Sequence, residues 1–307
     1  STRNFPNREG SKIQNGQLSS VALMDARSIA ATAANKGFLT PATEFDTEFS
    51  GKKYFFDKGI YEKRVYDSKG VAHPEVEIQF GPNIKDWPAM KELSDDLLVK
   101  VVSEIHDPVT TTDELIPSGE TSSFRSNPLG LAEFTLSRRD PSYVGKAKAV
   151  RDLTDDVKAE VENVAKAFDA KYADMAGRVS KAGLGSTIFA VKPGDGSARE
   201  QAASCQKVLG GWANIANEYA TKRYRSNLIN WGMLPFIYKD GDKNLPFAND
   251  DYVFVPNVKK MITDKLSTTK AYAIKKDGTI TEFELTMGDL TDDERKIILA
   301  GCLINYY

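Results

Sequence analysis

The chain has 307 residues, of which 41% are hydrophobic and 27% are charged, as is usual for a soluble globular protein. Its net charge of -2 and pI near 5.9 argue against a general nucleic-acid binder, which normally carries a basic surplus. No apolar run is long enough to span a bilayer, and the first ten residues lack the apolar core of a signal peptide.

Only two cysteines occur, Cys205 and Cys302, and they are far apart and outside any CxxC spacing. A disulfide framework is therefore not expected, and a reducing, cytoplasmic setting fits best. Two cysteines are also too few for an iron–sulfur cluster that needs three or four thiolate ligands. We expect no metal ligands in this chain.

The first third of the sequence predicts loops around one helix. It opens with the polar, arginine-bearing stretch RNFPNREGS. An alanine-rich pattern then predicts a helix from Ser19 to Lys36, ended by Gly37. Residues 38–95 are interrupted by Pro, Gly and Asp, as in TPATEFDTEF and KDWPAM, which indicates a surface linker with short strands such as Val76–Phe80.

From about Asp96 the pattern becomes α/β. LLVKVVSEI and STIFAV predict buried strands. Between them, apolar residues at steps of three and four predict a helix from Thr154 to Lys181, with Thr154 as the N-cap. Its apolar stripe must pack on something. We favour its own domain, with another part of the protein or another subunit as the alternative.

The last third predicts a long helix that starts at Ser197 and continues through ANIANEYATKRY. A hairpin turn is expected at Asp277-Gly278, and a final helix over Asp292–Leu303.

The turn GDGSARE, residues 194–200, joins a short strand to the start of a helix. Helix N-termini carry free N–H groups and partial positive charge, so the turn is a candidate anion site, and its glycines permit close approach. The plain alternative is a capping box formed by Ser197 and Glu200.

A second polar segment, VTTTDELIPSGE at 109–120, follows the first predicted strand, and its plain interpretation is a turn or helix cap. Arginines in loop-like context, at positions 3, 8, 125 and 199, are candidate carboxylate ligands. For any single arginine, a solvated side chain is the ordinary alternative.

Together these pieces resemble the aconitase family, and the bacterial aconitate hydratases in particular. The resemblance is carried by RNFxxR, by TTD with an arginine twelve residues after the Asp, by FRSNPLGLAEF, by GSxRE, by LGG and by LINWGMLPF. Order and spacing agree over nearly the whole chain, whereas 38–95 and 150–185 match poorly.

The resemblance implies an α/β fold of the aconitase swivel type, a mixed sheet or barrel with flanking helices. Residues 1–45 would be the end of the cluster-bearing third domain, 46–95 a linker, and 96–307 the swivel domain with a helical insertion at about 150–183. The family's 4Fe–4S cluster would be held by upstream domains of the same enzyme, and its open iron would act as a Lewis acid.

Matched position by position, the resemblance implies catalytic roles for Ser197, the base on the substrate C–H, and for Asp113. Substrate binding would fall to Arg3, Arg8, Arg125, Ala198 and Arg199. Two departures concern the substrate: Ala198 stands where the family has a second serine, and Glu114 where histidine is common.

The implied reaction is dehydration and rehydration of a hydroxy-polycarboxylate. Arg125 argues for a third carboxylate, hence citrate and isocitrate via cis-aconitate, because an apolar tail would leave its charge without a partner. A homoaconitate or isopropylmalate-type hydratase is the alternative. A non-catalytic anion-binding regulatory or assembly module is a second, and RNA binding is disfavoured by the mild acidity.

Overall fold

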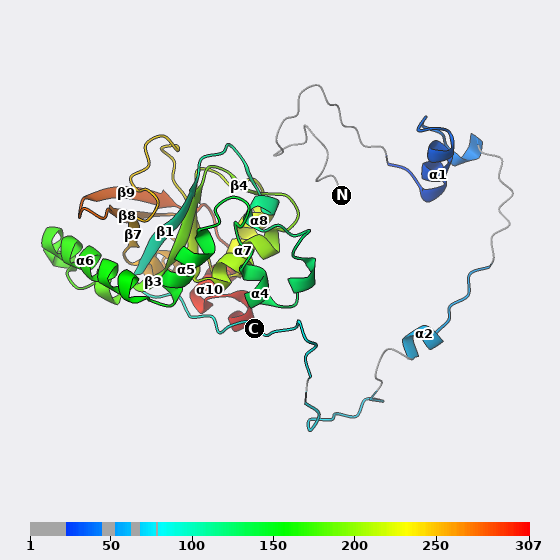
Figure 1. Cartoon of the computed structure of the whole chain (residues 1–307), viewed down its shortest axis with the longest axis horizontal. Coiled ribbons are helices and arrows are strands. Elements are labelled where there is room, and N and C mark those ends of the chain that lie inside the picture. Colours follow the sequence, from blue (N-terminus) through cyan, green and yellow to red (C-terminus); the bar gives the residue numbers. More distant parts are fainter. Residues whose placement is uncertain (1–22, 45–52, 63–67, 78) are drawn as a thin grey trace. The chain divides into compact units, whose positions relative to one another are not determined.

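The computed structural model describes residues 23–44, 53–62, 68–77 and 79–307 (Figure 1). The described residues divide into two units, one within residues 23–79 and the other formed by residues 80–307. Each unit is described by itself. Among the described residues, no helix has the length and apolar character that crossing a membrane requires.

In the first unit, the helix expected at 19–36 is confirmed over α1 (Ala26–Ala34), and positions 19–22 lie outside the described residues. It begins there because the Asp25 carboxylate caps it, accepting hydrogen bonds from the N–H groups of Arg27 and Ser28 at 2.9 and 3.0 Å. Gly37 follows its end at φ +90°. The unit also contains η1 (Ala42–Glu44) and α2 (Gly59–Glu62). The strand expected at Val76–Phe80 is wrong over its described residues, which are irregular.

Seven strands of the second unit close into a mixed barrel (Figure 1). The strands β1, β3, β5 and β6 run parallel, and β9, β8 and β7 complete the ring in antiparallel fashion. Their bounds, in barrel order, are Leu97–Ile105, Gly183–Ala190, Gly211–Ala216, Leu234–Ile237, Ile280–Thr286, Thr268–Ile274 and Tyr252–Val255. The predicted α/β class with a barrel and flanking helices is confirmed.

The helices cover the outside of this barrel and divide its apolar side chains into three clusters. One fills the barrel interior, and a second lies between the parallel strands and α4, α5, α7 and α8. Strands buried on both faces are apolar at nearly every position, which explains why LLVKVVSEI reads as a continuous run. The helices of this unit, in chain order, are α3 (Thr112–Leu115), α4 (Pro128–Ala132), α5 (Tyr143–Arg151), α6 (Asp155–Lys171), α7 (Arg199–Val208), α8 (Lys222–Asn230), α9 (Val258–Thr263), α10 (Asp292–Ala300) and α11 (Leu303–Tyr306).

The third cluster contains the apolar stripe of the helix predicted at 154–181. Phe168 of α6 is fully buried against Phe254 and Tyr272 of β7 and β8, with ring centroids 5.0 and 5.3 Å apart. The stripe therefore packs on its own domain. The helix is shorter than predicted: after Lys171 the chain continues as two short 3₁₀ turns, Ala173–Met175 and Val179–Lys181.

The long helix predicted from Ser197 through ANIANEYATKRY is wrong. It is three elements, α7, the buried strand β5 and α8. Gly210, at φ +89°, turns the chain after α7, and an added Cβ there would lie 2.9 Å from Arg151. WANIA is buried on both faces, and for so short an apolar run periodicity alone does not separate strand from helix.

The C-terminal predictions are confirmed. The strands β8 and β9 form a hairpin whose turn contains Asp277 and Gly278. Thr291 and Glu294 form a reciprocal capping box at the start of α10, which ends at Gly301. Residues 303–306 form the separate short helix α11.

Candidate functional site

Two segments far apart in the sequence meet at the carboxyl ends of the parallel strands. After β1 the chain forms β2 (Thr110–Thr111) and α3, and after β3 it forms β4 (Pro193–Asp195) and the loop before α7. The strands β2 and β4 pair in parallel, which joins Thr111 to Asp195. Ligands in open α/β sheets bind outside the carboxyl ends of strands. This pairing therefore brings the TTDE and GDGSARE motifs together at such an end.

Gly196 fits the two segments against each other. Its φ is +136°, and an added Cβ would lie 2.0 Å from Thr112 Oγ1. The same hydroxyl oxygen accepts a hydrogen bond from the N–H of Ala198 at 3.3 Å. Only glycine leaves room for this contact, so the close approach that this glycine permits is made by a protein side chain.

Gly194 makes a similar contact on the other side of the loop. Its φ is +99°, and an added Cβ would lie 2.3 Å from the Tyr224 ring. The buried Tyr224 hydroxyl donates to Asn214 Oδ1 at 2.8 Å and accepts from Gln206 Nε2 at 3.0 Å. The Asn214 amide in turn donates to Gln206 Oε1 at 2.7 Å. This closed polar network ties α7, β5 and α8 together beneath the loop. Tyr224 is a positioning residue that the motifs did not single out.

The helix cap expected in VTTTDELIPSGE is present. Thr111 caps α3, and Glu114 completes a capping box by accepting from the Thr111 backbone N–H at 2.8 Å. This gives a structural reason for an acid at position 114. Asp113 is exposed, and its carboxylate accepts from Arg138 Nη1 at 2.7 Å. The other guanidinium nitrogen of Arg138 donates to Glu120 Oε1 at 2.5 Å.

The capping box predicted for Ser197 and Glu200 is wrong. The N-cap of α7 is Ala198, one residue later, and it supplies no side-chain cap. Glu200 instead accepts from the Trp231 indole N–H at 3.1 Å. Ser197 is exposed just before the helix, and Arg199 is half-buried in its first turn. Because no side chain of the N-cap residue covers the helix start, this end keeps the character of an anion site.

The predicted arginines divide between described and undescribed parts of the chain. Arg125 is exposed and ends the short 3₁₀ turn Ser122–Phe124, which contacts α4, and α4 packs on α7. It forms no ion pair with the described residues. Arg3 and Arg8 lie outside the described residues. The substrate-binding roles expected for Arg3, Arg8 and Arg125 stay predictions.

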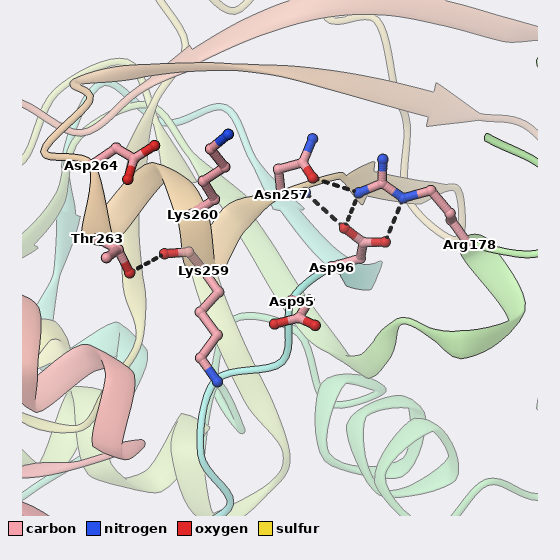
Figure 2. A pocket seen from close by; sticks show the side chains of 8 residues that line it. All are labelled: Asp95, Asp96, Arg178, Asn257, Lys259, Lys260, Thr263 and Asp264. Atoms are coloured by element: carbon pink, nitrogen blue, oxygen red, sulfur yellow. Dashed lines mark hydrogen bonds and ion pairs between the residues drawn. The ribbon is translucent and has the colours of Figure 1, made fainter. Parts of the chain in front are cut away.

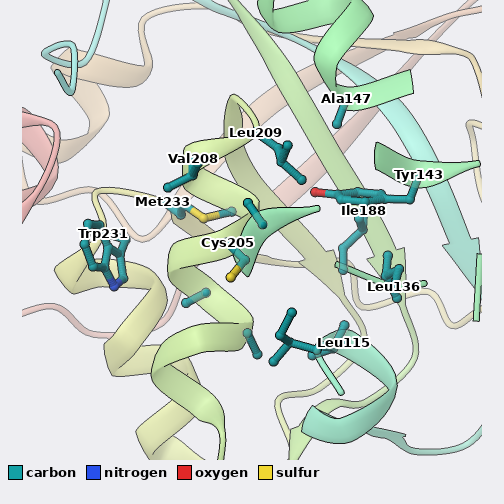
Figure 3. Close-up of a cluster of buried hydrophobic side chains, with 14 of the residues drawn as sticks. Leu115, Leu136, Tyr143, Ala147, Ile188, Cys205, Val208, Leu209, Trp231 and Met233 are labelled. Atoms are coloured by element: carbon teal, nitrogen blue, oxygen red, sulfur yellow. The ribbon is translucent and has the colours of Figure 1, made fainter. Parts of the chain in front are cut away.

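Both α3 and α7 are anchored in one apolar cluster (Figure 3). Leu115 of α3 and Cys205 of α7 lie in it, together with Tyr143 of α5 and Ile188 of β3. The segments that carry Asp113 and Ser197 are therefore fixed to one rigid scaffold. Burial raises the pKa of the Cys205 thiol to about 12, which disfavours the thiolate that metal binding needs.

The residues of this part of the chain do not fit an iron–sulfur cluster. Both cysteines are buried in the apolar core. Across residues 23–307, apart from the short gaps in the description, no three His, Cys, Asp or Glu side chains lie close enough to share a metal ion.

The opposite end of the barrel, where the parallel strands begin, is held by ion pairs instead. Asp96, just before β1, forms a bidentate pair with Arg178 and accepts from the Asn257 N–H at 2.7 Å (Figure 2). Arg178 Nη2 also donates to Asn257 Oδ1 at 2.8 Å. These groups satisfy one another, which is typical of a structural clamp.

Comparison with known proteins agrees with the motifs. Residues 144–241 match the aconitase C-terminal domain family. No curated protein matches the chain. A crystal structure of 3-isopropylmalate dehydratase (leuD) from Methanocaldococcus jannaschii matches with 20% identity over 69% of this chain and 92% of that one. The TM-score of this match is 0.41. Residues 144–241 are therefore similar to the aconitase C-terminal domain, in agreement with the motifs.

Proposed function

We propose that this chain is the carboxylate-binding and proton-transferring part of an enzyme that isomerises citrate and isocitrate through cis-aconitate. The observation that supports it best is the pairing of β2 with β4, which joins the Asp113 and Ser197 segments at the carboxyl ends of the parallel strands. The family match covers the Ser197 loop and α7.

In this proposal Ser197 removes the proton from the substrate carbon next to a carboxylate. A serine base must become an alkoxide, which is costly in water. The N-terminal end of α7 and the guanidinium of Arg199 both favour negative charge there. Charge that builds on the substrate carboxylate during this step would be stabilised by the arginines, with Arg3 and Arg8 among them.

The 4Fe–4S cluster that the family implies would be held by other domains of the enzyme, since the cysteines of this chain do not fit it. When bound, such a cluster supplies a Lewis acid for the leaving hydroxyl. The upstream cluster-bearing part is therefore the expected partner, and we expect no hydratase activity from the isolated chain.

The proposed role of Arg125 decides the substrate. It is exposed and forms no ion pair with the described residues, so it is suited to a third carboxylate. Arg125→Gln should raise KM for isocitrate about 10- to 100-fold with a smaller effect on kcat. The complete enzyme should prefer isocitrate to isopropylmalate. A preference for isopropylmalate would contradict the assignment of Arg125.

The proposed role of Ser197 is tested in the complete enzyme with Ser197→Ala. We expect kcat to fall by about 10³-fold or more, because general base catalysis typically contributes 10²–10⁴-fold. The free energy of unfolding should change by less than about 0.5 kcal/mol, since Ser197 does not cap α7. Ser267→Ala, at another exposed serine, is the matched control and should keep full activity. An active Ser197→Ala enzyme would refute the proposal.

A further inference from the structure

A cavity of about 360 Å³ lies at the C-terminal end of α7, where β3 and β5 begin. This volume falls in the range of small-molecule sites. Met90, Leu184 and Trp212 give it apolar walls, and Arg151 closes it at the end of α5. Because it adjoins the last turn of α7, it is separate from the Ser197 loop at the first turn.

Lys207, in the last turn of α7, lines this cavity and is only 6% exposed. Its amine is buried and has no hydrogen-bond acceptor among the described residues. It lies over the Trp212 ring, 3.6 Å from the ring centroid, and the ring face attracts the ammonium form. Buried amines in native proteins normally have an acceptor, and a ligand in the cavity would supply one to Lys207.

The charges around the cavity indicate the sign of that ligand. Lys91, Arg151 and Lys207 line it, against a single carboxylate, that of Asp152. Asp152 forms an ion pair with Arg151, which donates to it from Nε at 2.7 Å and from Nη2 at 3.0 Å. Lys91 and Lys207 therefore have no anionic partner among the described residues.

The walls indicate the rest of the ligand. Next to these cations the cavity offers the Trp212 ring and aliphatic side chains, which suit an apolar or aromatic body rather than a densely charged one. Lysine carries its charge on a flexible four-carbon stem, so the Lys207 amine can turn from the ring toward an anion in the cavity.

We propose that this cavity is a second ligand site, in which Lys207 pairs with the carboxylate of a small monoanion whose apolar or aromatic body packs on Trp212. The site is distinct from the Ser197 loop, and the proposal does not depend on the function proposed above.

The test uses the full chain labelled with 5-fluorotryptophan, which gives separate ¹⁹F resonances for the three tryptophans. Benzoate is the probe, and benzamide is its neutral isostere. We expect benzoate to shift the Trp212 resonance in a saturable manner and benzamide to bind at least about tenfold more weakly, because it lacks the charge. Lys207→Met should abolish the benzoate shift, and Lys260→Met, at an exposed lysine elsewhere on the domain, should leave it intact.

The proposal is overturned if benzoate produces no saturable shift, if benzamide binds equally well, or if Lys207→Met binds benzoate with unchanged affinity. Should Lys207→Met fail to fold, reductive methylation of the unmodified chain replaces it. Benzoate should then protect Lys207 from methylation while leaving Lys260 unprotected, as judged by mass spectrometry. Equal labelling of Lys207 with and without benzoate overturns the proposal.

Discussion

Two neighbouring residues in the last turn of α7, Gln206 and Lys207, differ in how their buried polar groups are satisfied. Gln206 belongs to the closed network with Tyr224 and Asn214, in which every hydroxyl and amide has a partner. Lys207 buries its amine against the Trp212 ring with no acceptor among the described residues. The same turn of the helix therefore carries both a satisfied polar network and an amine without an acceptor.

This difference shows which polar groups serve the fold and which cost it stability. A satisfied network stabilises and fixes one geometry, whereas an unpaired buried charge is destabilising unless a ligand completes it. Changes in the network and at Lys207 should therefore move the free energy of unfolding in opposite directions.

The largest effect is expected at Gly196. Gly196→Ala places a Cβ against Thr112 Oγ1 in a backbone conformation that side chains rarely adopt. We expect a loss of about 4 kcal/mol or more in the free energy of unfolding, measured by urea denaturation, and loss of activity in the complete enzyme.

The control for that substitution is Gly119→Ala, where an added Cβ meets nothing within 4 Å. It should change stability by less than about 0.5 kcal/mol. Equal stability of the two variants would show that the loop does not depend on the close contact with Thr112.

By contrast, Lys207→Met should stabilise the domain by about 1–3 kcal/mol near pH 7, because it replaces a buried amine that lacks an acceptor with an apolar side chain of similar length. Burial lowers the pKa of Lys207 from 10.5 to about 7. Between these values the unfolded chain binds a proton that the folded chain lacks, so the stability of the unmodified protein rises with pH across this window.

The difference in stability between Lys207→Met and the unmodified protein should therefore become smaller as the pH is raised from 7 to 10. Thermal unfolding at several pH values measures this difference. A stability difference that does not change with pH would mean that Lys207 stays protonated in the folded protein because the Trp212 ring stabilises its ammonium form.

A smaller effect is expected from Tyr224→Phe, which removes one hydroxyl from the closed network and leaves Asn214 Oδ1 without its donor. The expected loss is about 1–2 kcal/mol. Because Tyr224 supports the loop from beneath, the variant should also lower kcat of the complete enzyme. Tyr307→Phe, at a side chain that is 96% exposed, serves as the control and should match the unmodified protein. Unchanged stability of Tyr224→Phe would mean that the network fixes the geometry of the loop without contributing to the free energy of unfolding.

The smallest effect is expected from Arg138→Gln. Its pairs with Asp113 and Glu120 are about half exposed, and surface ion pairs contribute little to folding. The unfolding midpoint should not move measurably in 0.15 M salt. A clear shift would indicate that Asp113 is held more firmly than its exposure suggests.

Local patterns in the sequence were enough for several features. The LLVKVVSEI strand, the hairpin at Asp277-Gly278 and the capped helix α10 follow from apolar runs, turn chemistry and a capping box, all of which act between near neighbours. The family resemblance rests likewise on short motifs, and the match over residues 144–241 confirms it.

Tertiary structure decided what those patterns leave open. WANIA became a strand because β3 and β6 lie on either side of it. The helix after Ser197 begins one residue later than expected, and the Ala198 N–H there donates to the Thr112 hydroxyl, 86 positions earlier in the chain. The Tyr224 network and the buried Lys207 amine have no sequence signature. Burial and close contact between distant segments are properties of the packed chain, and a single stretch of residues does not encode them.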